Sequence, residues 1–304
     1  MKRTPLVAIA TLLAIGTPAQ ASSLFYDHFN ASAGTLLEGY NGYTITAAPS
    51  PATKIAEISG PGLSVAGQPS AGNSAYMYYS MGSEGGVPYT ATKNLGSGTF
   101  GSAGGTGINT FYVSALFNSN DFPTPETSAL GVWVKVGIPI DFDEPYADRY
   151  FSIGIKHAAH DYQVFAEGQG TQYGDWKLAD YSPGQTVQVV AKYVMTPMDA
   201  TGRYRFEVYA TANPVPNVEP TWTFIAGESD AVGSYKIGTY TVSNLNLTVE
   251  RSGSDSGSGG LIDGIRIGTN YADVVGVVPE PETWFMLLVG LGLLGGWWRY
   301  RPES

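Results

Sequence analysis

The sequence contains no cysteine among its 304 residues. This absence excludes disulfide bonds, thiolate metal sites and a cysteine nucleophile, so the fold must be stabilised by its apolar core. Charge is also scarce, because Asp, Glu, Lys and Arg together make up only 14% of the chain and leave a formal net charge of −10. An acidic chain of this kind argues against nucleic-acid partners and against binding of anionic lipid through a basic face.

Helical periodicity is absent between residues 22 and 276, where apolar residues nowhere recur at helical spacing for ten residues. Runs rich in β-branched and aromatic residues occur instead, separated by Gly, Pro, Asn and Asp. The clearest runs are Thr110–Phe117, Ala129–Val136, Tyr150–Lys156, Tyr162–Ala166, Thr186–Met195, Tyr204–Thr211, Thr221–Ile225, Tyr240–Val249 and Leu261–Ile267. The sequence therefore predicts an all-β chain with one antiparallel β-sandwich over residues 22–276, and Gly82–Gly107 as a long loop or a pair of weak strands.

The N-terminus has the composition of a secretory signal peptide. Lys2 and Arg3 precede the apolar stretch 6–15, and Ala19 and Ala21 supply the small residues of a cleavage site. The sequence predicts a signal helix within residues 1–21, with cleavage after Ala21. We therefore expect the export machinery and signal peptidase among the partners of the chain.

The C-terminal tail, residues 277–304, has three parts in a fixed order. Pro279-Glu280-Pro281 comes first, an uncharged apolar run over 284–298 follows, and Arg299 and Arg301 come directly after this run. The prolines fix φ and remove backbone donors, so this motif should be extended and accessible. As a helix the apolar run would be about 22 Å long, short for a bilayer core of ~30 Å. The sequence predicts a C-terminal transmembrane helix whose arginines stay in the cytoplasm. The alternative is a buried helix of a globular domain, which the four glycines of the run disfavour.

This order of parts resembles the PEP-CTERM sorting signal of Gram-negative bacteria. The resemblance implies an exported protein that is recognised at or near Pro279-Glu280-Pro281 by an exosortase, a membrane-embedded cysteine protease-transpeptidase. It further implies a transient inner-membrane intermediate, followed by a place at the cell surface or in the extracellular matrix. The basic end departs from the family pattern, because Tyr300 interrupts the arginines.

The two ends of the predicted sandwich carry a second resemblance. Residues 261–276 read hydrophobic-Asp-x-Ile-Arg-hydrophobic-Gly-Thr and continue to Ala-Asp-Val, and residues 25–30 read Phe-Tyr-Asp-His-Phe-Asn. Both segments are similar to the closing and opening strands of LamG-like domains, which are concanavalin A-like jelly rolls. The resemblance implies two stacked antiparallel sheets, pairing of the first and last strands, and a concave face that binds carbohydrate in many relatives.

The densest group of carboxylates is Asp141, Asp143, Glu144 and Asp148. Calcium takes six to eight hard oxygen ligands, so this segment is a candidate calcium site, and no other cofactor is predicted. The alternatives are a solvated acidic loop and a paired-carboxylate glycosidase site. No Glu-x-Asp-x-x-Glu strand supports the glycosidase alternative.

Aromatic residues are the candidates for carbohydrate binding, because the C–H faces of sugars pack against aromatic rings. Tyr162, Tyr173, Trp176 and Tyr181 lie in a stretch that is also rich in glycine and glutamine. Two further tryptophans, at positions 133 and 222, are expected to fill the core of the sandwich.

Motifs for other chemistry are weak. His157 and His160 precede Asp161, but the third histidine of the chain is far away in sequence. There is no G-x-S-x-G elbow, and the G-x-G segments follow no strand-then-helix pattern. The sequence thus predicts a non-enzymatic envelope or extracellular-matrix protein, sorted by exosortase, with exopolysaccharide as its candidate ligand. The alternatives are a secreted glycoside hydrolase or lyase and a purely structural surface protein.

Overall fold

The computed structural model describes residues 23–46, 53–65, 72–80, 89–96, 109–119, 132–141, 148–158, 161–169, 173–197, 204–212, 215–216, 218–227, 244–251 and 258–275. The predicted signal peptide with Ala19 and Ala21, and the predicted tail with Pro279-Glu280-Pro281, Arg299 and Arg301, lie outside these residues. Among the described residues, no helix has the length and hydropathy needed to cross a membrane.

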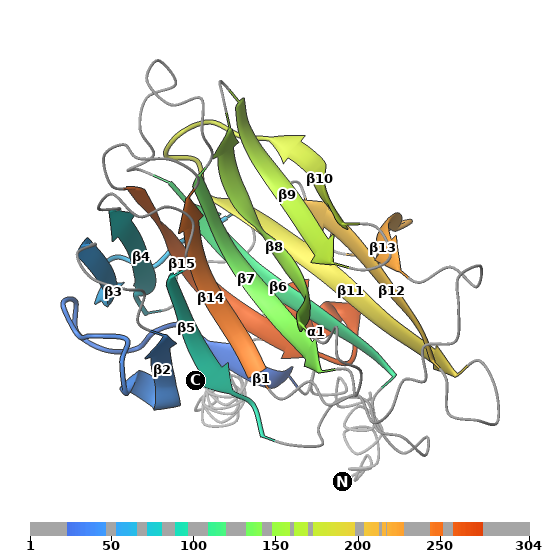
Figure 1. The fold of residues 1–304 in the computed structure, drawn as a ribbon, viewed down its shortest axis with the longest axis horizontal. Helices are drawn as coiled ribbons and strands as arrows, with labels where there is room; N and C mark the ends of the chain where they lie inside the picture. The colour runs from blue at the N-terminus through green and yellow to red at the C-terminus, as the bar shows by residue number, and fades with distance from the viewer. Residues whose placement is uncertain are drawn as a thin grey trace, which may run out of the picture.

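Two antiparallel sheets stacked face to face form the fold (Figure 1). The eight-stranded sheet contains β1 (Ser23–Asp27), β3 (Thr53–Ser59), β4 (Ser74–Ser80), β6 (Thr110–Asn118), β11 (Val187–Pro197), β12 (Tyr204–Ala212), β13 (Thr223–Gly227) and β15 (Ser258–Gly268). The seven-stranded sheet contains β2 (Tyr43–Thr46), β5 (Tyr89–Asn94), β7 (Val132–Asp141), β8 (Asp148–Ala158), β9 (Asp161–Gln169), β10 (Tyr173–Asp180) and β14 (Asn244–Arg251). A short 3-10 helix, η2 (Tyr40–Gly42), and one helix, α1 (Tyr271–Val275), complete the described elements.

The strand order confirms the predicted antiparallel sandwich of jelly-roll type. One sheet runs β13-β12-β11-β6-β15-β4-β3 and the other β10-β9-β8-β7-β14-β5-β2. β1 pairs with β15, placing Phe25 opposite Ile267, so the predicted pairing of the first and last strands is confirmed. The narrower LamG-like assignment stays a prediction.

Period-two alternation builds the core between the sheets. On β7, Val132, Val134, Val136 and Ile138 all belong to the buried core cluster, and the residues between them point to the opposite face. The core continues across to the other sheet, where Phe111 stacks on Tyr193 with ring centroids 4.7 Å apart.

The strands β10 and β5 lie outside the clearest strand-like runs of the sequence. β10 lies in the stretch rich in glycine and glutamine, where Gly174 and Asp175 have low strand propensity. It nevertheless pairs with β9 at the edge of its sheet, since Trp176 and Leu178 pack against the core. β5 lies inside Gly82–Gly107 and pairs with both β14 and β2, so the described part of this segment, residues 89–96, contains a strand.

The outer face of the eight-stranded sheet is partly covered by α1 and residues 215–222. Tyr112, Val190 and Tyr271 belong to a second apolar cluster there, and Trp222 packs against it. The prediction that Trp222 fills the core between the sheets is therefore wrong. Glu219 fixes the covering segment by accepting hydrogen bonds from Lys192 Nζ (2.6 Å), Trp222 Nε1 (2.7 Å) and Tyr112 Oη (3.1 Å). Burial alone would raise the pKa of Glu219, but these hydrogen bonds hold the pKa below its ordinary value.

The junction of β1 with β15 contains two buried carboxylates, Asp27 and Asp263. Asp263 accepts hydrogen bonds from the backbone N–H of Leu63 at 2.7 Å and of Gly264 at 2.6 Å. Burial, helped by the charge of Asp27, raises the pKa of Asp263 to about 7 although the two backbone donors oppose this rise. The aspartate of the hydrophobic-Asp-x-Ile-Arg segment therefore anchors the loop around Leu63.

Candidate functional site

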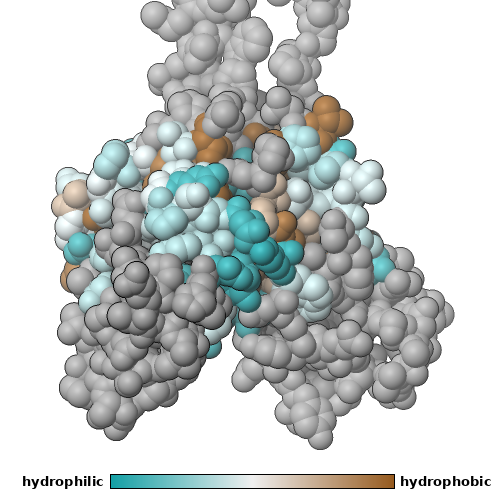
Figure 2. All heavy atoms as spheres, turned by 90° about the horizontal axis from the view of Figure 1, so that it is seen from above, coloured by the Kyte–Doolittle hydropathy of each residue, from teal (hydrophilic) through white to brown (hydrophobic). Residues whose placement is uncertain are grey.

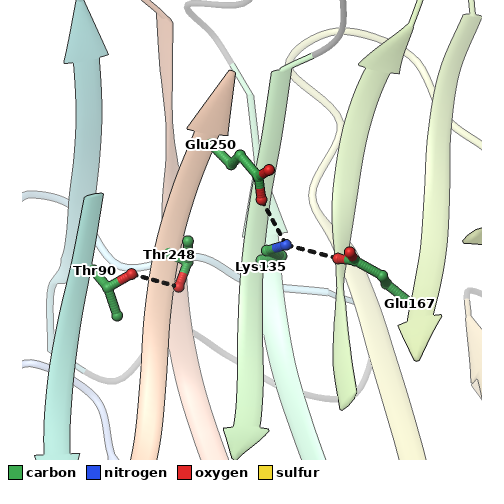
Figure 3. Close-up of polar contacts among 5 residues, drawn as sticks. All are labelled: Thr90, Lys135, Glu167, Thr248 and Glu250. Atoms are coloured by element: carbon green, nitrogen blue, oxygen red, sulfur yellow. Dashed lines mark hydrogen bonds and ion pairs between the residues drawn. The ribbon is translucent and has the colours of Figure 1, made fainter. Parts of the chain in front are cut away.

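The seven-stranded sheet carries polar side chains on the face turned away from the core, and we call this the polar face. Its members lie on the adjacent strands β5, β14, β7, β8 and β9 (Figure 3). They are Thr90, Trp133, Lys135, Ser152, Lys156, Gln163, Glu167, Thr248 and Glu250. Strand alternation produces this arrangement, because their neighbours Val134, Val249 and Ile155 belong to the core.

A lysine bridging two carboxylates lies at the centre of the polar face. Lys135 Nζ donates to Glu167 Oε2 at 2.7 Å and to Glu250 Oε2 at 2.8 Å (Figure 3). The Glu167 side chain is only 4% exposed, whereas that of Glu250 is 32% exposed. Burial alone would lower the pKa of Lys135, but the two carboxylates raise it, so the ammonium is charged. One positive and two negative charges thus lie together in a mostly buried position, and the group keeps a net charge of −1.

Gly154 lets Lys135 reach across to β9. The two residues are register partners on β8 and β7. A Cβ atom built on Gly154 would lie 3.0 Å from Lys135 Cβ and closer still to the β7 backbone. Glycine at this position therefore leaves the space that the lysine needs to cross β8 and meet Glu167.

Hydroxyl and aromatic groups lie on the polar face on either side of Lys135. The Thr90 and Thr248 hydroxyls are hydrogen-bonded at 3.1 Å (Figure 3). Lys156 Nζ lies 5.6 Å from the centre of the Phe165 ring. Trp133 is half-buried, with Glu250 as its register partner on one side and Lys156 on the other. The prediction that Trp133 fills the core is wrong, because it alternates with the core valines of β7.

The predicted stacking residues have different surroundings. Tyr162 is half-buried and stacks on His157, with ring centroids 4.6 Å apart. Tyr181 also lies beside Tyr162, but it is 7% exposed and its hydroxyl is 3.0 Å from that of Ser119. A stacking role for Tyr181 is therefore a wrong prediction, since its ring is part of the core. Burial also raises the pKa of its hydroxyl well above the ordinary value.

The other two predicted stacking residues lie on β10. Trp176 is half-buried and packs against the core from the edge of the sheet. Tyr173 is the register partner of Gln169 at the far end of the strand pair. Tyr162 and Trp176 lie apart along the sheet, because Trp176 pairs with Ala166, four residues along β9 from Tyr162.

The proposed calcium ligands belong to the connection between β7 and β8. Asp141 ends β7, Asp148 begins β8, and the two are register partners. Asp143 and Glu144 lie outside the described residues, so the calcium site stays a prediction. Within the described part of the chain, no three His, Cys, Asp or Glu residues gather to hold a metal ion. His157, part of the weak metal motif, is fully buried on the core side.

Sequence reasoning missed the bridge formed by Lys135, Glu167 and Glu250. The available signal was a charged residue at the outward position of three apolar strands. These strands are widely separated along the chain, and only the order β14-β7-β8-β9 brings the three charges together. Strand order is a tertiary property that the local pattern does not contain.

The described residues that are visible at one end of the sandwich are mainly hydrophilic (Figure 2). Figure 2 shows hydrophilic residues gathered across the middle of the described surface and hydrophobic ones in small separate patches. Only Leu24, Tyr26, Leu36 and Val218 are large exposed hydrophobic residues among those described. A broad apolar interface is therefore not present on the described surface in this view.

Comparisons with known proteins extend this description. No curated protein matches the chain. An endo-1,3-beta-glucanase from Streptomyces sioyaensis is similar in structure with a TM-score of 0.45 and 8% identity, covering 84% of this chain and 98% of its own. The alginate lyase vAL-1 from Chlorella virus has a TM-score of 0.37 and 9% identity, covering 64% and 84%. A Bacillus subtilis protein with a galectin-like fold has a TM-score of 0.34 and 9% identity, covering 81% and 98%.

The C-terminal tail gives the match that bears on function. Residues 277–301 match the family of the PEP-CTERM protein-sorting motif. The predicted sorting tail is therefore confirmed, and it indicates a chain that is exported and sorted by an exosortase through a membrane-anchored intermediate in Gram-negative bacteria.

Proposed function

We propose that this chain is a non-enzymatic envelope or extracellular-matrix protein that binds exopolysaccharide through its polar face. The observation that carries the proposal is the gathering of hydrogen-bonding side chains around Trp133 on a sheet face turned away from the core. Sugar hydroxyl groups both donate and accept hydrogen bonds. The half-buried groups Glu250 and Gln163 supply acceptors and an amide donor, and the indole ring of Trp133 supplies a stacking surface.

The lysine bridge supports this role by fixing the polar face before a ligand arrives. Glu250 is the most exposed member of the bridge, and its Oε2 is held at 2.8 Å by Lys135. A side chain that is already held loses little rotamer entropy on binding. The net negative charge of the bridge also suits a glycan that carries no dense negative charge.

Replacing Trp133 with alanine should weaken polysaccharide binding by about tenfold, the effect of losing roughly 1.4 kcal/mol of stacking and burial. The measurement uses the full chain in a detergent without sugar groups, applied to an array of bacterial exopolysaccharides. Trp222→Ala is the matched control, because Trp222 is also half-buried but lies on the outer face of the other sheet. Equal losses in both variants, or no binding by the parent chain, would contradict the proposal.

A carbohydrate-active enzyme is the second candidate function, and one specific observation favours it. Glu167 and Glu250 both lie within 2.8 Å of Lys135 Nζ, so their nearest oxygens are less than about 6 Å apart. Retaining glycosidases use two carboxyl groups about 5–5.5 Å apart. We favour binding because Lys135 occupies the space between the carboxylates where a glycosidic oxygen would have to lie. If the chain released new sugar ends from the polysaccharides of the array, and Glu250→Gln abolished this release, the enzyme function would be supported in place of the binding function.

Changing Pro279-Glu280-Pro281 to three alanines should leave export intact and trap the uncleaved chain in the inner membrane. The physical reason is that the exosortase has lost its recognition segment while the apolar run over 284–298 remains. Membrane fractionation and immunoblotting in a host that carries an exosortase measure the outcome. Changing Pro302 and Glu303 to alanine provides a control of similar composition outside the motif. A triple variant that reached the cell surface normally would show that the motif is dispensable.

A further inference from the structure

A hollow on the eight-stranded sheet is separate from the polar face. It has a volume of about 370 Å³, toward the lower end of the roughly 300–1,000 Å³ that small-molecule sites occupy. The residues that line it are Glu57, Ser59, Gly60, Pro61, Tyr76, Gly260 and Leu261. They belong to β3, β4, β15 and the turn after β3, at the end of the sheet where the strand order is β15-β4-β3.

Strand alternation places the hollow on the outer side of the sandwich. Ala56 and Met77 belong to the core, so their chain neighbours Glu57 and Tyr76 point outward. Register then aligns three outward residues in one row, because Tyr76 has Glu57 as its partner on β3 and Leu261 as its partner on β15. The hollow and the polar face therefore lie on opposite outer faces of the sandwich.

Aromatic rings and small residues shape the hollow. Tyr76 stacks on Tyr78 with ring centroids 6.1 Å apart and an angle of 27° between the rings, which fixes the direction of the Tyr76 ring. Gly259 is the register partner of Tyr78. A Cβ atom on Gly259 would lie 3.1 Å from Tyr78 Cβ and closer to the β4 backbone. Glycine therefore leaves the space beside the two tyrosines free of a side chain.

The lining has a definite chemical preference. It offers one carboxylate, from Glu57, beside the aromatic ring of Tyr76, and none of its seven residues is cationic. A sugar ring can place its C–H face on the tyrosine and donate hydroxyl protons to the carboxylate. A uronic acid would instead bring a second negative charge next to Glu57, and none of the seven lining residues carries a positive charge to compensate it.

We propose that this hollow is a second carbohydrate site, which takes a single uncharged pyranose residue. It is independent of the polar face, and its existence does not rest on the function proposed for that face. One consequence rests on the function proposed for the polar face. With both sites occupied, a single chain would hold two polysaccharide strands on opposite sides and link them. Such linking suits a component of an extracellular matrix.

The test uses saturation-transfer NMR on the full chain in a detergent without sugar groups. The probes are the methyl glycosides of glucose, galactose and mannose, with free glucuronate as the acidic comparison. At least one neutral glycoside should bind, and glucuronate should not. Glu57→Gln keeps the shape of the hollow and should weaken binding about tenfold, the cost of losing a charge-assisted hydrogen bond, while Tyr76→Ala should abolish it.

Two controls separate this site from the polar face. Tyr26→Ala removes another outward tyrosine of the same sheet, 40% exposed, and should leave glycoside binding unchanged. Trp133→Ala tests the polar face separately, because it should weaken binding to the array. The proposal is overturned if no neutral glycoside binds, if glucuronate binds equally well, or if binding survives both Glu57→Gln and Tyr76→Ala. Failure of the polar face would instead appear as an unaltered array signal for Trp133→Ala.

Discussion

Replacing Lys135 with methionine should lower the free energy of unfolding by about 3–5 kcal/mol, the usual cost of removing one partner of a buried ion pair. Lys135 is the shared partner of two carboxylates, and the Glu167 side chain is only 4% exposed. Methionine keeps most of the volume of lysine but offers no charge, so the buried Glu167 side chain would lose the ammonium group that now lies 2.7 Å from it. Urea unfolding at pH 7, followed by tryptophan fluorescence, measures the loss.

A second variant separates the missing charge from poor packing. Combining Lys135→Met with Glu167→Leu removes both buried charges and should recover much of the lost stability, because an apolar pair of similar size avoids the desolvation cost. Glu250→Gln alone should cost less than about 1 kcal/mol, since Glu250 is partly exposed. A Lys135→Met variant as stable as the parent chain would show that water or other groups already compensate Glu167.

The alternation within each strand could be read from the sequence, whereas the neighbours of each strand could not. The outward position of Lys135 follows from the core valines on either side of it. Its contact with Glu167 requires β8 to lie between β7 and β9 with glycine at position 154. The tail differs in this respect, because the PEP-CTERM motif is a linear signal and its parts are recognised without a fold.

Two aromatic residues also show that local sequence does not give the surroundings of a side chain. The sequence predicted Tyr181 as a stacking residue and Trp133 as a core residue, and both predictions are wrong. Tyr181 follows β10, an edge strand that the sequence did not reveal, and its ring turns into the core beside Tyr162. Trp133 sits in a strongly apolar run, but period-two alternation sends it outward. Local composition predicted the wrong side in both cases because it ignores the direction of the side chain.

The stability of the fold should fall as the pH rises from about 4 to about 7, owing to Asp263. Burial and the charge of Asp27 raise the folded-state pKa of Asp263 to about 7, whereas an unfolded aspartate has a pKa of about 3.9. Within this window the folded state keeps a proton that the unfolded state has released. One such proton changes the free energy of unfolding by up to about 1.4 kcal/mol per pH unit. The contribution is fully present below about pH 4 and is lost as the pH passes 7.

Asp263→Asn isolates this contribution from those of the other carboxylates. The variant cannot titrate at position 263, so its unfolding free energy, measured in urea at pH 5 and pH 8, should change less than that of the parent chain. It should be less stable at pH 5, because one amide oxygen cannot serve both backbone donors, Leu63 and Gly264.

Asp27→Asn removes the neighbouring charge and should move the loss of unfolding free energy to lower pH. It keeps one side-chain oxygen for the backbone N–H of Phe29, which lies 2.9 Å from Asp27 Oδ1. Equal slopes in the parent chain and Asp263→Asn would mean that Asp263 is already ionised at pH 5, with the two backbone donors outweighing burial at the junction of β1 with β15.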